Sequence, residues 1–480
     1  MVMGEFTQEV EVLVVGGGPA GYAAAFRAAD LGLEVTMINK EEHPGGVCLN
    51  RGCIPSKTLL YAATLIHDAR RAEAMGLAFS GPEIHLNKLR QFKKESIGTL
   101  TEGLSTLIDD RKIQYINARA VFEDSTTIRL LDTESEISRF SFQYAIVAAG
   151  ALPLALPGVE IREGGRIMDY KGALDLPDIP EKLLVVGGGY IGLELGSVYA
   201  ALGSSVTLAE MGAELLPGAD RDLVEILQKQ IEEQFAGVHT TTTVKNLEEK
   251  QDHVAVAFEG EIDQEKQDFD RVLIAIGVQP QSQDMGLDAA EVELDDNGFI
   301  RVDEQGRTSV ENIFAAGDIS GGTLLAHVGF AEGKIAAEAI AGKDSAFDAR
   351  AVPFVLYTDP EIAWTGLTEA EADRQERNVE VVRYPWRASG RAVGVGHPDG
   401  VTKYIIDSDS GRILGVGIAG RHAGELIAEG ALAMEMGAVA EDLALTIHAH
   451  PTFSETLGEA AQLFHGTPTH LRSRKKTKKE

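Results

Sequence analysis

The two cysteines of the chain, Cys48 and Cys53, lie close together in the segment GGVCLNRGCIPSK. Such a pair could form a structural disulfide, contribute to a metal site or exchange electrons with a substrate. A chain of 480 residues has a core large enough to fold without a short-loop disulfide. A zinc site would need four ligands, and no second cysteine and histidine cluster lies nearby in the sequence. The pair therefore favours redox chemistry over the other two uses.

His450 and Glu455, in the segment HAHPTFSETLGEAAQLF, could supply the base that thiol exchange requires. Pro451 fixes the chain after His450, and a carboxylate at Glu455 could orient the imidazole and stabilise its protonated form. The spacing alone favours a simpler interpretation, in which both residues cap a helix. His448 is expected to be structural.

The chain must bend between the cysteines if they are to bond. An ideal helix places the Cα atoms of residues i and i+5 roughly 8 to 9 Å apart, beyond the limit of about 7 Å for a disulfide. Gly52 offers the flexibility, and Pro55 suits the first turn of a helix predicted over 56–69. Because helix N-terminal amides stabilise a thiolate, Cys53 is the better candidate for the stable thiolate.

Two segments of the chain share one plan: a strand, a glycine turn, a helix and a second strand. The turns fit the pattern GxGxxG, with Gly16, Gly18 and Gly21 in the first and Gly187, Gly189 and Gly192 in the second. Glycines in this context allow a tight turn, so that a diphosphate can approach the helix N-terminus. The repeat predicts a duplicated βαβ unit and two bound dinucleotides.

The residue that ends the second strand of each unit is expected to contact the ribose of the dinucleotide, so its type indicates which dinucleotide binds. Glu210 could accept hydrogen bonds from both ribose hydroxyls of NAD and would repel the 2′-phosphate of NADP. The matching residue of the first unit is Asn39, which can still bind a ribose but without a charge-assisted bond. A later segment, TSVENIFAAGDI, places Gly317 and Asp318 after an apolar strand; alone, it is equally typical of a structural aspartate.

Acidic residues (74) outnumber basic residues (44), which gives a net charge of −30. This charge disfavours nucleic-acid binding and suits solubility, including in a salty cytoplasm. The sequence shows no signal-peptide pattern and no apolar run long enough to span a membrane. We expect a cytoplasmic protein without nucleic-acid or membrane partners, and a disordered basic tail at RSRKKTKKE.

The cysteine segment, the two glycine turns, FAAGD and HAHPTFSE follow one another in this order. In this combination the chain, from about residue 9 to about residue 465, resembles the flavin-dependent pyridine nucleotide-disulfide oxidoreductases, and among them the dihydrolipoamide dehydrogenases. Glutathione reductase-like members carry arginines after the second glycine unit, and mercuric reductases add a C-terminal cysteine pair; neither feature is present here. Soluble transhydrogenase-like members lack the cysteine pair found here.

The resemblance implies a role for each candidate residue. Cys48 would exchange with the substrate and Cys53 would face the flavin, whereas His450 and Glu455 would reach the cysteines of the partner subunit in a homodimer. Lys57 would lie near the flavin and could pair with Glu194. The implied FAD residues are Gly16, Gly18, Gly21, Asn39, Lys57, Gly150, Gly317, Asp318 and Ala326; the implied NAD residues are Gly187, Gly189, Gly192, Glu194, Glu210 and Gly277; no metal is implied.

The chain departs from the family pattern at several positions. Asn39 replaces an acid, Val278 replaces a frequent arginine after AIG, and Val328 stands where a lysine is common. The segment VAAGA stands where relatives often have ATGS. These departures concern flavin affinity and potential. Arg51 replaces a small apolar residue between the cysteines, where it could bias thiolate stability or the choice of substrate.

The implied reaction is the FAD-dependent oxidation of protein-bound dihydrolipoamide to lipoamide, with reduction of NAD⁺ to NADH. The implied partners are the lipoyl domains of 2-oxo acid dehydrogenase or glycine cleavage complexes. Two alternatives stay open: an NAD(P)H-dependent disulfide or metal-ion reductase of the same fold, and a flavin-binding redox protein without turnover. The joint presence of both cysteines, His450 and Glu455 argues against the latter.

The predicted fold is α/β, with two Rossmann-like dinucleotide-binding domains, for FAD and NAD, and an α+β C-terminal dimerisation domain. The FAD domain is predicted at 1–150 and, as a second segment, at 278–348. The NAD domain is predicted at 151–277, the interface domain at 349–465 and the basic tail at 466–480.

Overall fold

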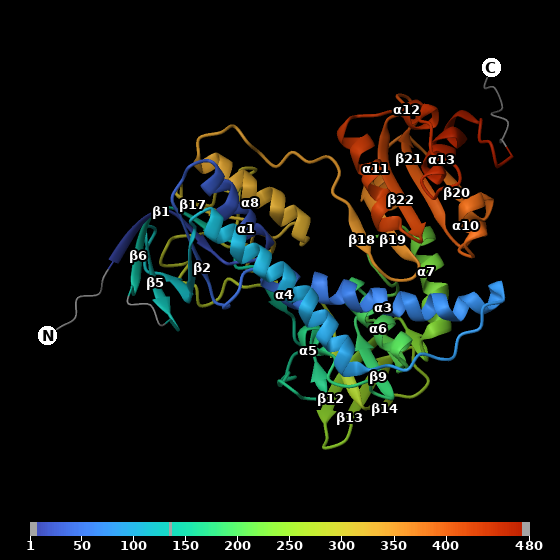
Figure 1. The fold of residues 1–480 in the computed structure, drawn as a ribbon, viewed down its shortest axis with the longest axis horizontal. Coiled ribbons are helices and arrows are strands. Elements are labelled where there is room, and N and C mark those ends of the chain that lie inside the picture. The colour runs from blue at the N-terminus through green and yellow to red at the C-terminus, as the bar shows by residue number, and fades with distance from the viewer. Residues whose placement is uncertain (1–6, 134–136, 473–480) are drawn as a thin grey trace.

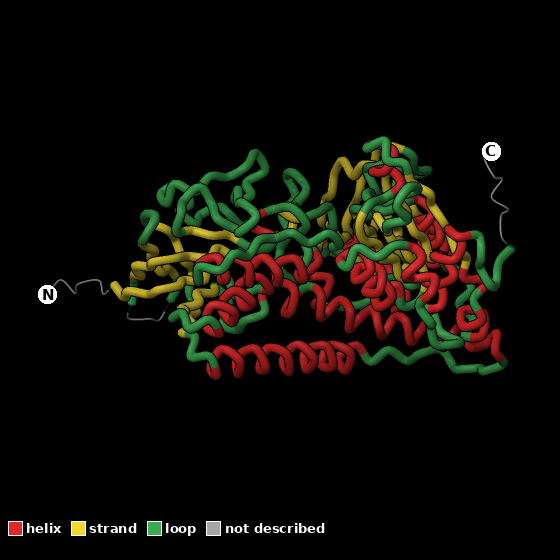
Figure 2. Tube along the Cα trace, turned by 90° about the horizontal axis from the view of Figure 1, so that it is seen from above, coloured by secondary structure: helices red, strands yellow, loops and turns green. Residues whose placement is uncertain are grey.

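The computed structural model describes residues 7–133 and 137–472 of the chain. It has three units, each centred on a main β-sheet (Figure 1). The two ends of the described chain lie at opposite ends of the molecule (Figure 2). Most of the predicted basic tail, from position 473 onward, falls outside the described residues.

The first unit holds a seven-stranded sheet that is mostly parallel. In spatial order its strands are β3 (Gln114–Asn117), β2 (Val35–Asn39), β1 (Thr7–Val15), β6 (Arg139–Val147), β5 (Thr127–Leu131) and β4 (Arg119–Phe122), and β17 (Ile313–Ala315) also pairs with β6. The pairs β5–β6 and β4–β5 are antiparallel. Because β17 comes from a much later part of the chain than β6, two separate segments build this unit.

Helices α1 (Pro19–Asp30) and α8 (Ala326–Ile340) pack side by side in the first unit (Figure 1). Small residues permit this approach, since a Cβ atom on Gly333 would lie 2.2 Å from the carbonyl oxygen of Ala20. Leu13 and Val14 of β1 point to opposite faces of the sheet and both are fully buried. The 3₁₀ helix η2 (Asp318–Ser320) follows β17 directly.

The second unit repeats the order of four strands of the first, β3-β2-β1-β6. Its parallel sheet runs β11 (Gly237–His239), β10 (Ser205–Ala209), β9 (Lys182–Val186), β15 (Arg271–Ile274) and β8 (Ile167–Met168). In both units the strand before the glycine turn lies inside the sheet, with its βαβ partner on one side and a later strand on the other. The predicted duplication of the βαβ unit is therefore confirmed.

Further elements complete the second unit and connect it to the first. They are the helices α5 (Tyr170–Asp175), α6 (Tyr190–Leu202) and α7 (Arg221–Gln234), and an antiparallel sheet of β12 (Thr242–Glu249), β13 (Val254–Gly260) and β14 (Lys266–Phe269). Strands β7 (Ala151–Pro153) and β16 (Val278–Pro280) pair antiparallel where the chain leaves the first unit and returns to it.

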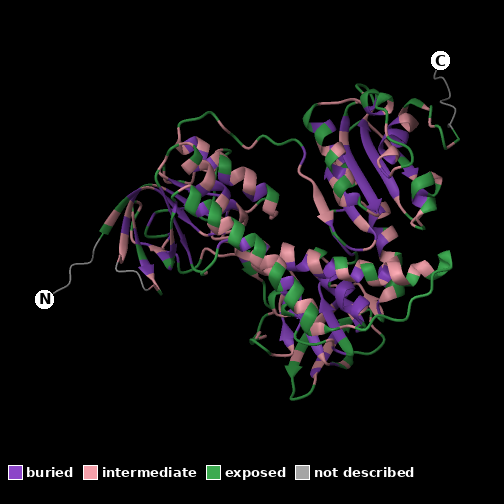
Figure 3. Cartoon of the chain, viewed as in Figure 1, coloured by how far each residue is buried: buried purple, intermediate pink, exposed green. Residues whose placement is uncertain are grey.

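The third unit is an antiparallel sheet with helices around it. Its strands are, in spatial order, β18 (Phe354–Leu356), β19 (Glu361–Gly366), β22 (Ile413–Gly420), β21 (Val401–Asp407) and β20 (Val379–Pro385). Its helices are α9 (Glu369–Arg374), η3 (Trp386–Ala388), α10 (Gly390–Gly394), α11 (Ala423–Glu435), α12 (Ala440–Leu445) and α13 (Glu455–His465). Figure 3 shows that buried residues concentrate in the sheets of all three units. The predicted α/β and α+β classes are confirmed.

Helices α2 (Gly46–Arg51) and α3 (Cys53–Arg71) carry the two cysteines. Helix α3 continues into η1 (Ala72–Met75) and packs against both α6 and the long helix α4 (Leu86–Asp110). At its far end Arg421 of the third unit donates two hydrogen bonds of 2.7 Å to the Asp68 carboxylate. Helix α3 therefore contacts both the second and the third unit. Among the described helices, none is long and apolar enough to cross a membrane.

Candidate active site

Cys48 and Cys53 form a disulfide, and their Cα atoms are 4.7 Å apart. Helix α2 ends at Arg51, Gly52 interrupts the helical path, and α3 begins at Cys53. The predicted bend is thus confirmed, and the tight packing there suits glycine, since a Cβ atom on Gly52 would lie 3.0 Å from the Val47 carbonyl oxygen. Cys53 begins a helix of 19 residues, whose N-terminal amides favour a thiolate at this position.

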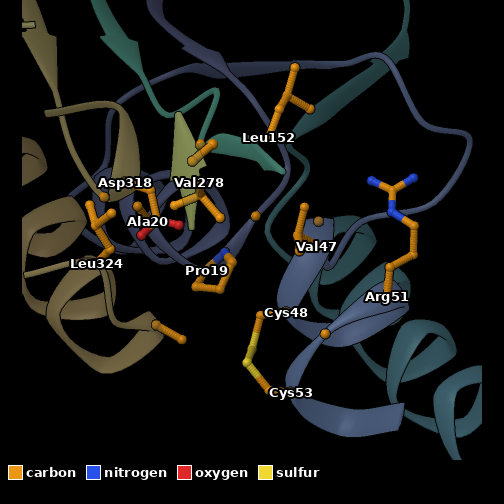
Figure 4. A pocket seen from close by; sticks show the side chains of 18 of the residues that line it. Pro19, Ala20, Val47, Cys48, Arg51, Cys53, Leu152, Val278, Asp318 and Leu324 are labelled. Carbon is orange, nitrogen blue, oxygen red and sulfur yellow. A yellow bond between two sulfur atoms is a disulfide. The ribbon is translucent and has the colours of Figure 1, made fainter. Parts of the chain in front are cut away.

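The disulfide lines a cavity whose walls come from the first and second units (Figure 4). The candidate FAD residues that also line it are Gly16, Gly18, Asn39, Lys57, Gly150, Gly317, Asp318 and Ala326. Gly21 is not on the cavity wall. It lies in α1, where a Cβ atom would be 1.9 Å from the Gly16 carbonyl oxygen, so its place is in the packing of helix against turn. The structure therefore brings the cysteines and the first glycine turn to one site.

The first glycine turn has the form that a dinucleotide diphosphate requires. Gly16 has φ +114°, and a Cβ atom there would lie 2.2 Å from the Ala148 carbonyl oxygen. Gly18 is the N-cap of α1, and no side chain caps the helix. The first-turn amides are thus left for an anion from the cavity, and these residues fit FAD.

Asn39 uses both ends of its amide to hold the turn and the loop after β2. Its Oδ1 accepts a hydrogen bond from Gly17 N at 3.2 Å, and its Nδ2 donates to the Tyr115 hydroxyl at 2.8 Å. Nδ2 also lies 3.1 and 3.2 Å from the carbonyl oxygens of Glu41 and His43. A carboxylate could not donate these bonds, so they explain why this position holds asparagine and not an acid.

Asp318 begins η2 at the opposite side of the cavity from the cysteine helices (Figure 4). Burial raises the pKa of its carboxyl group, and none of the described residues donates a hydrogen bond to that group. A partly buried acceptor without a protein donor suits a ligand hydroxyl. The neighbouring Gly317 N already has a protein partner, because it donates a hydrogen bond to Glu332 Oε2 at 2.7 Å.

Lys57 and Glu194 form the pair that the sequence predicted. Lys57 Nζ donates to both carboxylate oxygens of Glu194, at 3.1 and 2.8 Å, and lies 4.7 Å from the centre of the Tyr357 ring. The Glu194 side chain is 4% exposed, and it also accepts a bond from Tyr357 N at 3.1 Å. Glu194 follows the second glycine turn in sequence but faces the disulfide cavity.

The second glycine turn repeats the geometry of the first. Gly187 has φ +109°, a Cβ atom on Gly192 would lie 2.1 Å from the Gly187 carbonyl oxygen, and the N-cap Gly189 has no side-chain cap. Glu210 takes the place of Asn39, with its Oε2 accepting from Gly188 N at 2.6 Å and its Oε1 from Gly212 N at 2.6 Å. The uncapped helix and the carboxylate fit NAD. Gly277 directly precedes β16.

His450 and Glu455 are hydrogen-bonded in the third unit, away from the walls of the disulfide cavity. His450 Nδ1 lies 2.7 Å from Glu455 Oε1, and Glu455 Oε2 accepts a bond of 2.7 Å from Thr452 N. Burial alone would raise the pKa of Glu455, but the bonds from Thr452 and His450 hold it below its usual value. The His450 side chain is 69% exposed, so its Nε2 is open to a partner.

Sequence reasoning missed several residues around these groups. Tyr115 and Glu41 support Asn39 and Arg51, respectively, and Glu429 binds His448 at 2.7 Å and raises the pKa of that histidine. Tyr190, the first residue of α6, lines the cavity beside Glu194. The position of Tyr190 directly after the second glycine turn was the one sequence signal available. The others become neighbours only through the fold.

Residues 10–333 match the family model described as pyridine nucleotide-disulphide oxidoreductase, and residues 352–461 match its dimerisation domain. A dihydrolipoyl dehydrogenase of Haemophilus influenzae is 46% identical over 471 residues, which cover 98% of each chain. Dihydrolipoyl dehydrogenase 2 of Haloarcula marismortui is 42% identical over 98% of this chain and 100% of its own.

Two solved structures share the fold over almost their whole length. LpdA from Mycobacterium tuberculosis superimposes with a TM-score of 0.87 at 27% identity, covering 94% of this chain and 99% of its own. The HOCl-induced flavoprotein disulfide reductase RclA from Escherichia coli has a TM-score of 0.84 at 26% identity, covering 94% and 99%. With the disulfide, the two glycine turns and these matches, the chain belongs to the pyridine nucleotide-disulphide oxidoreductase family.

Proposed function

We propose that this chain oxidises protein-bound dihydrolipoamide to lipoamide and reduces NAD⁺ to NADH, with FAD and NAD as its cofactors. The main support for the proposal is the Cys48–Cys53 disulfide at the start of α3, which lines the same cavity as the first glycine turn. The near full-length similarity to dihydrolipoyl dehydrogenases supports the same activity.

The residues present fit both cofactors. FAD would be held by the turn at Gly16 and Gly18, with Asp318 accepting a hydroxyl hydrogen bond, and Lys57 would lie near its ring system. NAD would be held by the turn at Gly187 and Gly189. When bound, FAD supplies the two-electron chemistry that connects the cysteine pair to NAD⁺. The protein contributes positions, charges and proton transfer.

Thiol exchange begins with a proton transfer to His450. Glu455 occupies Nδ1 of the imidazole, so Nε2 takes the proton from one thiol of dihydrolipoamide. The resulting thiolate attacks Cys48 Sγ, the Cys48–Cys53 bond breaks, and Cys53 leaves as a thiolate. A mixed disulfide now joins the substrate to Cys48.

The second substrate thiol completes the exchange. It attacks the substrate sulfur that is bonded to Cys48, which forms the disulfide of lipoamide and releases Cys48. The imidazolium of His450 gives its proton to the departing Cys48 sulfur and takes up the proton of the second substrate thiol, so that it stays protonated. The enzyme disulfide has then gained two electrons and the substrate has lost two. The N-terminal amides of α3 stabilise the Cys53 thiolate formed in this exchange.

We place each active site at the junction of two subunits of a homodimer. Within one chain His450 does not line the disulfide cavity, and its side chain is 69% exposed. The match of residues 352–461 to a dimerisation domain supports a homodimer. His450 of the partner subunit would then face Cys48.

We further propose that the substrates are the lipoyl domains of 2-oxo acid dehydrogenase or glycine cleavage complexes, and that the enzyme works in the cytoplasm. The test is NADH formation from NAD⁺ and dihydrolipoamide by the FAD-loaded chain. Turnover with a free lipoyl domain would support the protein-bound substrate. Absence of NADH formation by a flavin-loaded dimer would refute the proposal. Faster reduction of other disulfides or of metal ions by NADH or NADPH would favour the reductase alternative.

A further inference from the structure

Arg51 is placed on the disulfide helix but directed away from the sulfur atoms. It is the last residue of α2, and it lines the same cavity as the disulfide and the first glycine turn. Figure 4 shows its side chain extending away from the Cys48–Cys53 bond. The expectation that Arg51 biases the thiolates is therefore not what this geometry favours. The guanidinium is available to another part of the cavity.

An ion pair with Glu41 fixes the position of the guanidinium. Glu41 lies two residues beyond β2, and its carbonyl oxygen accepts hydrogen bonds from Asn39 Nδ2 at 3.1 Å and the Tyr115 hydroxyl at 2.9 Å. The Glu41 backbone is thus anchored to the first sheet. It holds Arg51 beside the end of β2, close to the expected ribose and diphosphate positions of a dinucleotide.

Arg51 keeps hydrogen-bond donors free for an anion. A guanidinium has five N–H donors, and within the described chain its one hydrogen bond is the contact with Glu41. Two other cations on the cavity wall are engaged, because Lys57 binds Glu194 and Lys40 Nζ donates to Gln281 Oε1 at 2.6 Å. The planar, forked guanidinium matches the oxygens of a phosphate group.

Helix α2 starts against the glycine turn and ends at Arg51. A Cβ atom on Gly46, the first residue of α2, would lie 2.6 Å from Gly18 Cα, so the helix starts against the turn. Arg51 ends the same helix, about 7.5 Å further along it, and lines the same cavity as Gly16 and Gly18. Elsewhere on the cavity wall is Val278, an uncharged residue where the family resemblance predicts an arginine.

We propose that Arg51 is a binding residue for the diphosphate of FAD, and that it provides from the disulfide helix the positive charge that Val278 does not provide from β16. The turn itself offers backbone N–H groups and the partial charge of the α1 N-terminus, whereas a diphosphate carries two negative charges. This inference rests on the proposed function, because it requires FAD in the cavity.

The test measures the rate at which FAD leaves the purified holoenzyme, followed by the rise of flavin fluorescence after dilution at several NaCl concentrations. Three variants are compared with the natural chain: Arg51→Met, Arg51→Lys and Glu41→Gln. We expect Arg51→Met to release FAD about tenfold faster, which corresponds to about 1.4 kcal/mol. Arg51→Lys keeps the positive charge but lacks the forked guanidinium, so its rate of FAD release should lie between those of the natural chain and Arg51→Met. Salt should accelerate release from the natural holoenzyme more than from Arg51→Met.

Glu41→Gln distinguishes two roles of Arg51: binding of the phosphate, and attachment of α2 to β2 through the ion pair with Glu41. It weakens the Arg51–Glu41 ion pair but leaves the guanidinium in place, so FAD release should stay within about twofold of the natural rate if Arg51 binds phosphate. Release as fast as in Arg51→Met would show that Arg51 acts only by tying α2 to β2, and would overturn the inference. An FAD release rate in Arg51→Met equal to that of the natural chain would also overturn the inference.

A rescue variant tests whether a guanidinium at position 278 can replace that of Arg51. Adding Val278→Arg to Arg51→Met should slow FAD release again, because it returns a guanidinium to the same cavity, whereas Val278→Met should not. The disulfide midpoint potential should be the same in Arg51→Met and the natural chain; a shifted potential with unchanged FAD release would favour the thiolate role instead. If the natural chain bound no FAD at all, the proposed function would fail, which is distinguishable from failure of this inference alone.

Discussion

Lys57 Nζ lies 2.8 Å from Glu194 Oε2, and this contact joins the helix of Cys53 to the helix of the second glycine turn. The same carboxylate accepts a hydrogen bond from Tyr357 N of the third unit. All three units therefore meet at one buried glutamate beside the disulfide cavity. The arrangement places a charge pair on the wall of the disulfide cavity.

Replacing Glu194 with glutamine should lower both stability and turnover. The amide keeps the shape but removes the charge that pairs with Lys57, which is itself about one-third exposed. We expect a loss of about 1 to 2 kcal/mol in the free energy of unfolding and about tenfold in kcat. Urea unfolding and steady-state NADH formation check this, with the exposed Glu225→Gln as the control. Natural turnover in Glu194→Gln would contradict a role beside the flavin.

Replacing His450 with glutamine should lower the rate of dihydrolipoamide oxidation about 10² to 10⁴-fold, because a general base is lost. Glu455→Gln should cost less, about tenfold to a hundredfold, since the imidazole remains but its orientation and charge partner change. Glu455 stays ionised in the folded protein because its pKa lies below the usual value. Stopped-flow reduction of the enzyme by dihydrolipoamide measures both variants, with His253→Gln as the control.

A mixed dimer tests whether His450 acts across the subunit boundary. One subunit carries Cys48→Ser and the other carries His450→Gln, so each chain alone is defective. If His450 serves the partner's disulfide, the mixed dimer contains one complete active site and should regain about half of the natural activity. If each site uses its own histidine, the mixed dimer should have as little activity as either variant.

Glu210 should determine the preference for NAD over NADP. Glu210 directly follows β10, and its carboxylate would lie close to a 2′-phosphate, which it would repel. We expect kcat/KM with NAD to exceed that with NADP by at least about a hundredfold, and Glu210→Gln to narrow the ratio by about tenfold. An unchanged ratio in Glu210→Gln would place the discrimination elsewhere.

Glu361, on β19, should make the protein less stable as pH rises. Burial raises its pKa to about 7, even though Gly424 N donates to its carboxylate at 2.8 Å. The folded chain therefore binds more protons here than the unfolded chain, whose glutamate titrates near 4.5, and stability falls as pH rises from there through about 7.

A Glu361→Gln variant should lack this pH dependence. Relative to the natural chain, its free energy of unfolding should increase by about 1 to 3 kcal/mol between pH 4.5 and 8. Urea unfolding at fixed protein and FAD concentrations measures the difference. A difference that does not change with pH would contradict the raised pKa.

The sequence predicted those parts of the site that depend on local geometry. The break at Gly52 and the two glycine turns follow from residue types a few positions apart, and the structure has them. The helix after the break was predicted over 56–69, whereas α3 begins three residues earlier, at Cys53. The duplicated strand order follows from the repeated segments. The domain limits stay a prediction, as do the roles of the individual site residues.

Contacts between distant segments could not be predicted in the same way. The partners of Asn39 and Arg51 are Tyr115 and Glu41, and neither pairing leaves a periodic signal in the chain. Glu194 shows both cases, since its pairing with Lys57 followed from the family resemblance but its bond with Tyr357 N came only from the packing of the third unit.

The most direct test of the proposed reaction is NADH formation from dihydrolipoamide by the FAD-loaded natural enzyme and its Cys53→Ser variant. The proposed reaction requires that electrons pass through the Cys48–Cys53 pair. It therefore predicts steady NADH formation by the natural enzyme and a loss of at least about 10³-fold in the variant, with FAD still bound. Full activity in Cys53→Ser would show that the disulfide does not carry the electrons and would contradict the central claim.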